Sequence, residues 1–263
     1  MHQVAFCTKH HKTAIIAPLL QSLGFKLVEY AAFDTDSLGT FSGECPRTLT
    51  PDEAALEKAK QACQATSMRY GLGSEGSFGG GPYPGFVNWN HELLCLYDSH
   101  SEQIIYASAQ GPTSLEPMVF ESFAELSRTL PLLGEQRWIL NAENQLHKGQ
   151  TLASLSQLED NNTLTYPVTL EPDFRAMYCP ERQQMIHKAG ADLVKRLAAT
   201  CPACQAPNFV VKATETGLTC SHCHYPTQQV KSETYHCDMC HHESIQTHPD
   251  FSADPAQCGV CNP

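Results

Sequence analysis

The sequence predicts an α/β protein, built as a mixed sheet flanked by helices, with a small zinc-binding module at its carboxyl end. Short apolar segments of strand and helix type alternate along the first three quarters of the chain. A hydrophobic content of 41% over 263 residues is sufficient for a sizeable globular core. Eight of the 13 cysteines form four Cys-x-x-Cys pairs in the last quarter. We therefore expect two domains, residues 1–196 and 197–263.

The elements of the first domain follow from apolar spacing and end signals. A buried strand is expected at 4–7, a helix at 12–23 and a second strand at 26–30. Thr50, Pro51 and Glu53 begin a helix that extends to about residue 65, because they supply an N-cap, a first-turn proline and the acid of a capping box. Further strands are expected at 68–72, 93–97, 103–109, 137–140 and 165–170, and further helices at 122–132, 151–158 and 180–199. Pro167 predicts that the last of these strands lies at a sheet edge.

The stretch from Leu72 to Gly85 is the first candidate for a functional site. Six of its 14 residues are glycine, which allows a backbone to approach a ligand closely. We expect a ligand-binding loop after the strand at 68–72, in which Glu75 helps to hold a metal–phosphate group. In that case Pro82–Gly85 shapes the floor under a base. The alternative is an ordinary surface loop rich in glycine and proline.

The cysteine pairs predict two structural zinc ions. Each half of the module has zinc-ribbon spacing, in which two Cys-x-x-Cys turns supply four thiolates to one tetrahedral ion. The simplest pairing is sequential, with one zinc per half, and a crossed pairing of the first pair with the third and the second with the fourth is the alternative. Neighbouring histidines are expected to lie near the ions rather than to bind them. The expected ligands are Cys201, Cys204, Cys220, Cys223, Cys237, Cys240, Cys258 and Cys261.

The charge of the chain argues against nucleic acid as a partner. The formal net charge is −11. Residues 197–263 contain two basic and six acidic residues, a formal charge of −4, and each four-thiolate zinc site adds about −2. Because nucleic-acid binding requires a basic surface, we expect the module to act as a structural cap or to contact a protein.

The apolar segments and the cysteine pairs indicate where in the cell the protein is expected. The longest apolar runs are too short to span a bilayer, and the amino terminus lacks the pattern of a signal peptide. Zinc-type cysteine pairs are typical of a reducing compartment. The sequence therefore predicts a cytoplasmic protein without membrane association.

Charged residues of the first domain form a candidate hydrolytic site. Cleavage of a nucleoside triphosphate requires Mg²⁺ to neutralise phosphate charge, and Mg²⁺ prefers a few carboxylates together with water and phosphate oxygens. Glu53 and Glu75 are the expected carboxylates, with Glu75 acting as metal ligand or base. Lys12, at the start of its helix, is expected to contact the phosphates. The remaining candidates are Lys58, Arg47, Arg175 and Arg182 as cations, and Asp34, Asp36 and Glu44 as reserve carboxylates.

The order of several short motifs resembles the inosine/xanthosine triphosphate pyrophosphatases over roughly residues 1–190. The motifs are Thr8–Lys12 after the first strand, Thr50-x-x-Glu53-x-Ala55-x-x-Lys58-Ala59 at a helix start, Ser74-Glu75-Gly76, Gly81–Gly85 and Arg182 in the late helix. The resemblance implies hydrolysis of nucleoside triphosphates to monophosphates and pyrophosphate. Glu75, Glu53 and Lys12 would be catalytic, and Thr8, Ser74 and Gly76 would join the cations in binding substrate.

The chain departs from the family pattern at several positions. Lys9 and Ala54 stand where those enzymes usually have asparagine, Glu75 stands where they often have aspartate, and Pro180-Glu181 replaces a Ser-His pair. The whole chain also resembles the uncharacterised domain-of-unknown-function family 6671, which implies no activity.

Simpler interpretations stand beside this hypothesis. Glu53 is fully accounted for as a capping-box residue, and Lys12 and Lys58 as solvated helix positions. A second class of function is a non-enzymatic nucleotide-binding or adaptor protein that contacts a partner through the zinc module. Convergence of Glu53, Glu75 and Lys12 on one cleft would favour the enzyme.

Overall fold

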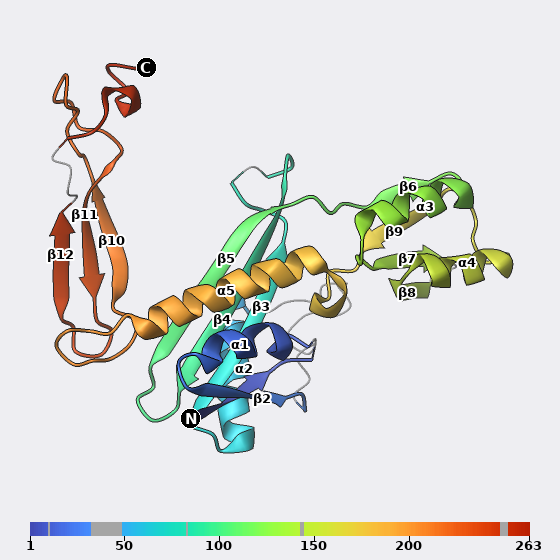
Figure 1. Cartoon of the computed structure of the whole chain (residues 1–263), viewed down its shortest axis with the longest axis horizontal. Coiled ribbons are helices and arrows are strands. Elements are labelled where there is room, and N and C mark those ends of the chain that lie inside the picture. The colour runs from blue at the N-terminus through green and yellow to red at the C-terminus, as the bar shows by residue number, and fades with distance from the viewer. Residues whose placement is uncertain (10, 33–48, 83, 143–144, 248–251) are drawn as a thin grey trace. The chain divides into compact units, whose positions relative to one another are not determined.

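The computed structural model divides the chain into two compact units, Met1–Val194 and Lys195–Pro263 (Figure 1). It describes all residues except 10, 33–48, 83, 143–144 and 248–251. The boundary between the two units falls inside a long helix, α5 (Pro180–Ala198). Among the described residues, no helix combines the length and apolar character needed to cross a membrane.

The main sheet of the first unit has five strands in the order β2-β1-β3-β4-β5. β1 pairs in parallel with β2 and β3, whereas β4 pairs antiparallel with β3 and β5. The sheet is therefore mixed, and the predicted α/β class is confirmed. Its strands are β1 (His2–Cys7), β2 (Phe25–Tyr30), β3 (Tyr70–Phe78), β4 (Asn88–Asp98) and β5 (Ile104–Thr113).

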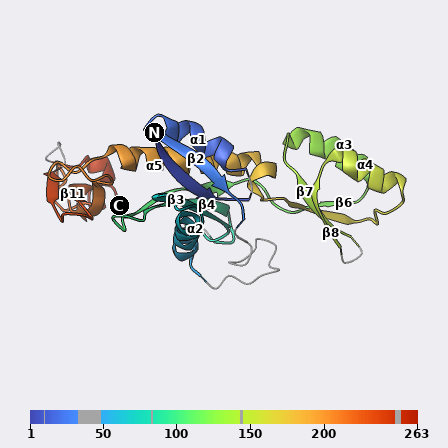
Figure 2. The same cartoon turned by 90° about the horizontal axis from the view of Figure 1, so that it is seen from below.

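Helices cover both faces of this sheet. Figure 2 shows α1 (Thr13–Gln21) and α5 (Pro180–Ala198) on one side and α2 (Pro51–Thr66) on the other. The α2 backbone lies directly against Gly71 and Gly73, where any side chain would collide with helix carbonyl groups. These two glycines therefore serve helix packing. Alanines of α2 contact the buried side chains of the facing strands, among them Leu93 and Cys95.

The glycine-rich stretch differs from the prediction. β3 extends from Tyr70 to Phe78, so Ser74, Glu75 and Gly76 lie within a strand and not in a loop after it. The strand continues because every residue from Tyr70 to Phe78 pairs with β4. Only the later glycines form the connection to β4. They adopt positive φ angles that suit glycine, and they are Gly79, Gly80, Gly81 and Gly85.

A second, smaller sheet completes the first unit. Its four antiparallel strands have the order β6-β9-β7-β8 and pack against α3 and α4 around a separate core that includes Phe120, Trp138 and Leu170. Pro167 precedes β9, which lies inside this sheet, so the predicted edge position was wrong. The elements are β6 (Met118–Phe120), α3 (Phe123–Thr129), β7 (Trp138–Ala142), β8 (Gln145–Gln150), α4 (Leu152–Asp160) and β9 (Val168–Pro172), with 3₁₀ turns at Leu130–Leu133 and Ala176–Tyr178.

The second unit is an antiparallel meander of three strands. They are β10 (Val210–Thr216), β11 (Val230–His236) and β12 (Glu243–Thr247), and a 3₁₀ turn follows at Pro255–Gln257. A pair of cysteines lies before β10, between β10 and β11, between β11 and β12, and after β12.

Candidate functional site

The first candidate site lies beyond the carboxyl end of β1. The last β1–β3 pair joins Phe6 to Leu72, so β3 continues past β1 with Ser74 and Glu75. From this point the chain passes through α1 back to β2 on one side, whereas β3 is followed by β4 on the other. The region beyond the carboxyl ends of strands whose connections leave in opposite directions is the usual ligand position in open α/β sheets.

On the face covered by α1 and α5, a lysine lies between a hydroxyl and a carboxylate. The Lys12 Nζ donates a hydrogen bond to the Ser74 Oγ at 3.1 Å and lies 3.8 Å from the Glu92 Oε2. All three side chains are buried. Glu92 pairs directly with Gly76 in the β3–β4 register, two residues from Ser74, so these positions share one face of the sheet.

Arg182, in the first turn of α5, binds the same carboxylate. Its Nε donates to the Glu92 Oε1 at 2.6 Å, its Nη2 to the Glu92 Oε2 at 3.3 Å, and its Nη1 to the carbonyl oxygen of Phe174 at 2.5 Å. The guanidinium is only 1% exposed. Arg182 was predicted to bind substrate, but these bonds direct it to Glu92.

On the opposite face, Lys58 of α2 forms an ion pair with Glu75 of β3. Both side chains are nearly buried. The two faces are close enough to interact electrostatically. Burial lowers the pKa of Lys12 to about 8, with further effects from Arg182, Glu92, Glu75 and Lys58. Three cations and two carboxylates therefore gather around the end of β1.

Glu53 does not contribute to this group. Its carboxylate is exposed and accepts hydrogen bonds from the Thr50 backbone N–H and hydroxyl, both at 2.9 Å, which lowers the pKa of Glu53. Both halves of the capping box are present. The expected convergence of Glu53 with Glu75 and Lys12 is therefore not found, because the cap holds the Glu53 side chain.

The other predicted residues are distributed around the site. Thr8 is buried at the end of β1, where its N–H donates to the Tyr30 carbonyl oxygen. Gly76 lies against the Arg182–Glu92 pair and leaves no room for a side chain. Arg175 is engaged with Asp173 through hydrogen bonds that include 2.6 Å to the Oδ2. Arg47 and the reserve carboxylates Asp34, Asp36 and Glu44 lie outside the described residues.

Glu92 is the residue of the cluster that the sequence interpretation missed. It lies in β4 among the buried residues Leu93, Leu94, Cys95 and Leu96. A single acid at the start of such an apolar run was the available signal, because an unpaired buried carboxylate is costly.

A cavity of about 600 Å³ lies beside this cluster. Phe78 and Phe174 stack on each other at 3.8 Å between ring centroids and line it together with residues of the second sheet, among them Asn141 and Lys148. The Arg182 guanidinium lies 5.8 Å from the centre of the Phe78 ring. The charged cluster and the cavity therefore meet at this pair of aromatic rings.

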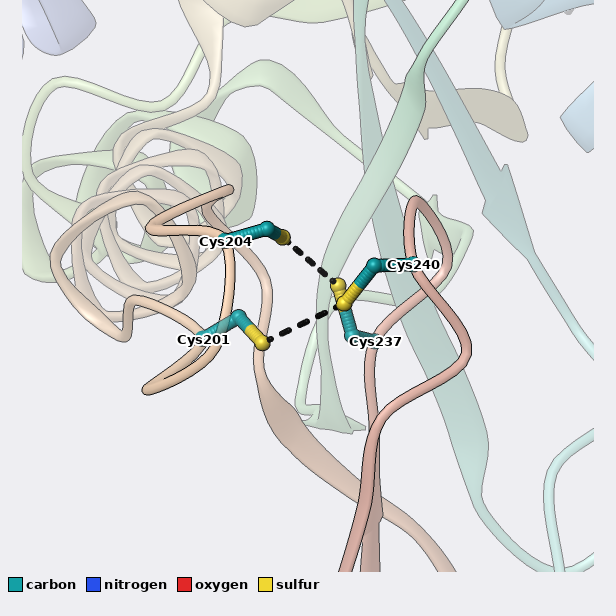
Figure 3. Close-up of side chains that lie close together, drawn as sticks. All are labelled: Cys201, Cys204, Cys237 and Cys240. Atoms are coloured by element: carbon teal, nitrogen blue, oxygen red, sulfur yellow. Dashed lines mark hydrogen bonds between the residues drawn. The ribbon is translucent and has the colours of Figure 1, made fainter.

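The second candidate site consists of two four-cysteine clusters, and their pairing corrects the sequential expectation. One contains Cys201, Cys204, Cys237 and Cys240 (Figure 3), and the other Cys220, Cys223, Cys258 and Cys261. In the first, the Cys201 Sγ lies 3.7 Å from that of Cys240, and the Cys204 Sγ 3.6 Å from that of Cys237.

The crossed pairing follows from the meander. One strand separates each cysteine pair from the next, and a strand of seven residues spans about 20 Å. Successive pairs therefore lie at opposite ends of the sheet, and alternate pairs meet at the same end. Sequential pairing would require both pairs of one zinc site to lie at one end.

Each cluster suits a zinc ion. Its four Sγ atoms lie within 4.8 Å of one another, and four thiolates form a closed tetrahedral shell that leaves no position for substrate. Hydrogen bonds from the backbone N–H groups of Cys223 and His222 lower the pKa of Cys220 to about 6, whereas hydrogen bonding with the neighbouring thiols, Cys223 first, raises the pKa of Cys261 to about 12. Among the described residues, no histidine belongs to either cluster. The clusters are compatible with zinc ribbons.

Comparison with known proteins gives one family match. Residues 138–263 are similar to a family described as a domain of unknown function, DUF6671. The match begins at the start of β7, so the resemblance expected over the whole chain was too broad. It includes Arg182 and all eight zinc-type cysteines, but not Lys12, Lys58, Glu75 or Glu92. No curated protein matches the chain.

Proposed function

We propose that the first unit is a Mg²⁺-dependent hydrolase that converts nucleoside triphosphates to nucleoside monophosphates and pyrophosphate. The observation that supports it is the buried cluster of Lys12, Lys58, Arg182, Glu75 and Glu92, supplied by five different elements at the carboxyl end of β1. Buried cations in excess of carboxylates favour an anionic ligand, because an uncompensated buried charge is costly.

The start of α1 contributes to phosphate binding. Lys12 is its N-cap residue, no hydrogen bond from its side chain caps the helix, and the first turn contains no acid. Such an end presents backbone N–H groups and a positive dipole to an anion. The phosphates therefore lie between the α1 amino terminus and Lys58, with the Lys12 ammonium and the Ser74 hydroxyl beside them.

Glu75 is suited to bind a Mg²⁺ ion that is already coordinated by the phosphates of a nucleotide. Mg²⁺ is usually held by one or two carboxylates, with substrate oxygens and water completing its shell, and it supplies neutralisation of phosphate charge. Within the described residues, no group of three acidic side chains is close enough to bind a metal. Glu75 would supply one carboxylate to a magnesium ion bound together with the triphosphate, and Lys58 compensates the charge of Glu75 in the present structure.

The nucleoside is assigned to the neighbouring cavity. Its volume of about 600 Å³ is adequate for a base and its sugar. The Phe78 and Phe174 rings supply an apolar wall, and the Asn88 and Asn141 amides are polar groups of the kind that recognise a base.

The test is a screen for pyrophosphate release with Mg²⁺ and a panel of canonical and deaminated nucleoside triphosphates. We expect turnover by the wild-type chain and a loss of about 100-fold or more in Glu75→Gln, which keeps the shape of the side chain but not its charge. Glu135→Gln is the matched control, because Glu135 is an exposed acid of the same unit. Absence of turnover with every triphosphate, or unchanged turnover in Glu75→Gln, contradicts the proposal.

A second candidate is a protein that binds the nucleotide without cleaving it. It is favoured by the ion pairing of both carboxylates, Glu75 with Lys58 and Glu92 with Arg182. The zinc module would then contact a partner protein, and its exposed apolar side chains include Tyr225, Met239, Ile245 and Val260. Tight binding of a magnesium–nucleotide complex without pyrophosphate release would identify this function.

A further inference from the structure

Glu92 is a buried acid whose side chain occupies the space left by a glycine on the neighbouring strand. It is 2% exposed and lies opposite Gly76 in the β3–β4 register. A side chain at position 76 would collide with the Arg182 guanidinium and the Glu92 carboxylate. The glycine therefore makes room for this ion pair on the face that also carries Ser74.

Arg182 fixes the orientation of Glu92. Two of its nitrogens bind the two carboxylate oxygens and the third binds the Phe174 carbonyl oxygen. Paired hydrogen bonds between planar groups restrict rotation of both side chains. Because the Arg182 side chain is 1% exposed and bonds to Glu92 through two of its nitrogens, its link to Lys12 in this structure is the Glu92 carboxylate.

The fixed carboxylate faces Lys12. The Glu92 Oε2 is shared between Arg182 and the Lys12 ammonium, which lies 3.8 Å away and donates to the Ser74 Oγ. Burial and the charges of Arg182 and Lys58 lower the pKa of Lys12, whereas Glu92 and Glu75 raise it. Glu92 is therefore the nearest negative charge to this buried ammonium.

We propose that Glu92, held by Arg182, is a positioning residue that fixes the Lys12 ammonium beside Ser74, where it receives an anionic group of the ligand. The identity of that group as a phosphate rests on the proposed function, whereas the coupling of Glu92 to Lys12 does not. Without the Glu92 charge, Lys12 loses its nearest counter-ion beside Arg182, releases its proton more readily and leaves its position.

The first measurement follows the protonation of Lys12 directly. The ¹³Cε resonance of Lys12, assigned with Lys12→Arg, is titrated in wild type, Glu92→Gln and the control Glu135→Gln. We expect the wild-type midpoint below that of exposed lysines, a further decrease in Glu92→Gln, and no change in Glu135→Gln. A general loss of packing would shift many resonances without selecting Lys12, so this readout separates positioning from a structural role.

The second measurement is binding of inorganic tripolyphosphate at pH 7.5. Glu92→Gln removes a carboxylate, which by itself favours an anion, but it also removes the charge that holds the Lys12 ammonium in place. Loss of the Lys12 contact with the anion corresponds to about 10–100-fold in affinity, so we expect Glu92→Gln to weaken binding by up to that factor. Tighter binding in Glu92→Gln contradicts the positioning role. If Glu92→Gln does not fold, Glu92→Asp takes its place. This variant keeps the charge but withdraws it by one methylene, and smaller changes of the same sign are expected.

The outcomes separate the two proposals. An unchanged Lys12 midpoint in folded Glu92→Gln or Glu92→Asp overturns the positioning role, whatever the phosphate binding. If tripolyphosphate does not bind to the wild-type chain, the triphosphate site is overturned, and the Lys12 titration still decides the role of Glu92.

Discussion

Asp98, at the end of β4, accepts four hydrogen bonds from neighbours that hold it ionised. The Arg69 Nε and Nη2 donate at 2.8 and 2.6 Å, and the His100 N–H and the Ser101 hydroxyl both donate at 3.0 Å. Partial burial opposes ionisation, but the hydrogen bonds and the Arg69 charge prevail and lower the pKa of Asp98 to about 2. Because ionised Asp98 is favoured by the folded state, this contact stabilises the protein at neutral pH.

The pH dependence of this contact is testable with Asp98→Asn. The folded pKa lies below the unfolded value, so the stabilisation is present above about pH 4 and is lost as the pH falls through 2. We expect Asp98→Asn to lower the free energy of unfolding of the first unit by about 1–2 kcal/mol at pH 7. The difference from wild type should shrink between pH 4 and pH 2.

Tryptophan fluorescence in urea is a suitable measurement. The chain has two tryptophans, Trp89 in β4 and Trp138 in β7, and both belong to the first unit. The signal is therefore independent of zinc release from the second unit in acid. A difference between Asp98→Asn and wild type that remains constant from pH 7 to pH 2 would assign the effect to packing instead of charge.

At the scale of elements, α2 begins with a complete capping box. This motif explains why a glutamate stands at position 53 without giving it a catalytic role. The Thr50 hydroxyl accepts from the Glu53 N–H, and the Glu53 carboxylate accepts from the Thr50 N–H. Glutamine can replace glutamate in this motif. Glu53 and Glu75 are therefore distinguishable by the same substitution.

We expect Glu53→Gln to retain the stability of the first unit and any pyrophosphate release, whereas Glu75→Gln loses the latter. Thr50→Ala, which removes the cap, should destabilise the unit by about 1 kcal/mol in urea unfolding. Turnover that disappears in a fully stable Glu53→Gln variant would instead give Glu53 a direct chemical role.

The elements that the sequence predicts well are those whose signals are local. The α2 start at Thr50 and Pro51 is capped as expected, because a cap involves residues only three positions apart. The role of a glycine is harder to predict, because it depends on which distant segment packs against it. Gly71, Gly73 and Gly76 are required by α2 and by the Arg182–Glu92 pair, which are distant in sequence.

The candidate site is partly predictable for a similar reason. Lys12, Lys58, Ser74, Glu75 and Arg182 were identified from the sequence, and the structure brings them to one region. The pairings among them, and Glu92 as the partner of Arg182, were not predictable. Arg182 lies 90 residues from Glu92, and only strand register and helix placement bring these two charges together. A pyrophosphatase-like activity stays a prediction.

At the scale of the whole molecule, the residues matched by the family do not coincide with either structural unit. The match to residues 138–263 combines three strands of the smaller sheet of the first unit (β7, β8 and β9), the long helix α5 and the zinc module. The charged cluster consists mostly of residues outside that range. The part of the chain that resembles this family contains both four-cysteine clusters, Arg182 and part of the cavity wall, whereas the other four charged residues of the cluster belong to residues 1–137.

The two four-cysteine clusters of the zinc module connect segments of the second unit that are distant in sequence, and they give the clearest prediction for the whole molecule. The cluster that contains Cys201 joins the segment before β10 to the β11–β12 connection. The cluster that contains Cys220 joins the β10–β11 connection to the segment after β12. We expect a unit of this size with few large apolar residues to depend on metal binding for its folding. We expect two zinc ions per chain by elemental analysis.

Pairs of substitutions at exposed cysteines determine the pairing. Cys204→Ala/Cys240→Ala removes two ligands from one crossed site and should leave one zinc per chain, whereas Cys204→Ala/Cys223→Ala damages both sites and should leave neither bound tightly. Sequential pairing predicts the reverse, since Cys204 and Cys223 would then share an ion. All three substituted side chains are exposed, so the two double variants lose the same number of thiolates with little change in packing. Zinc content after gel filtration therefore reports which strand ends each ion holds together.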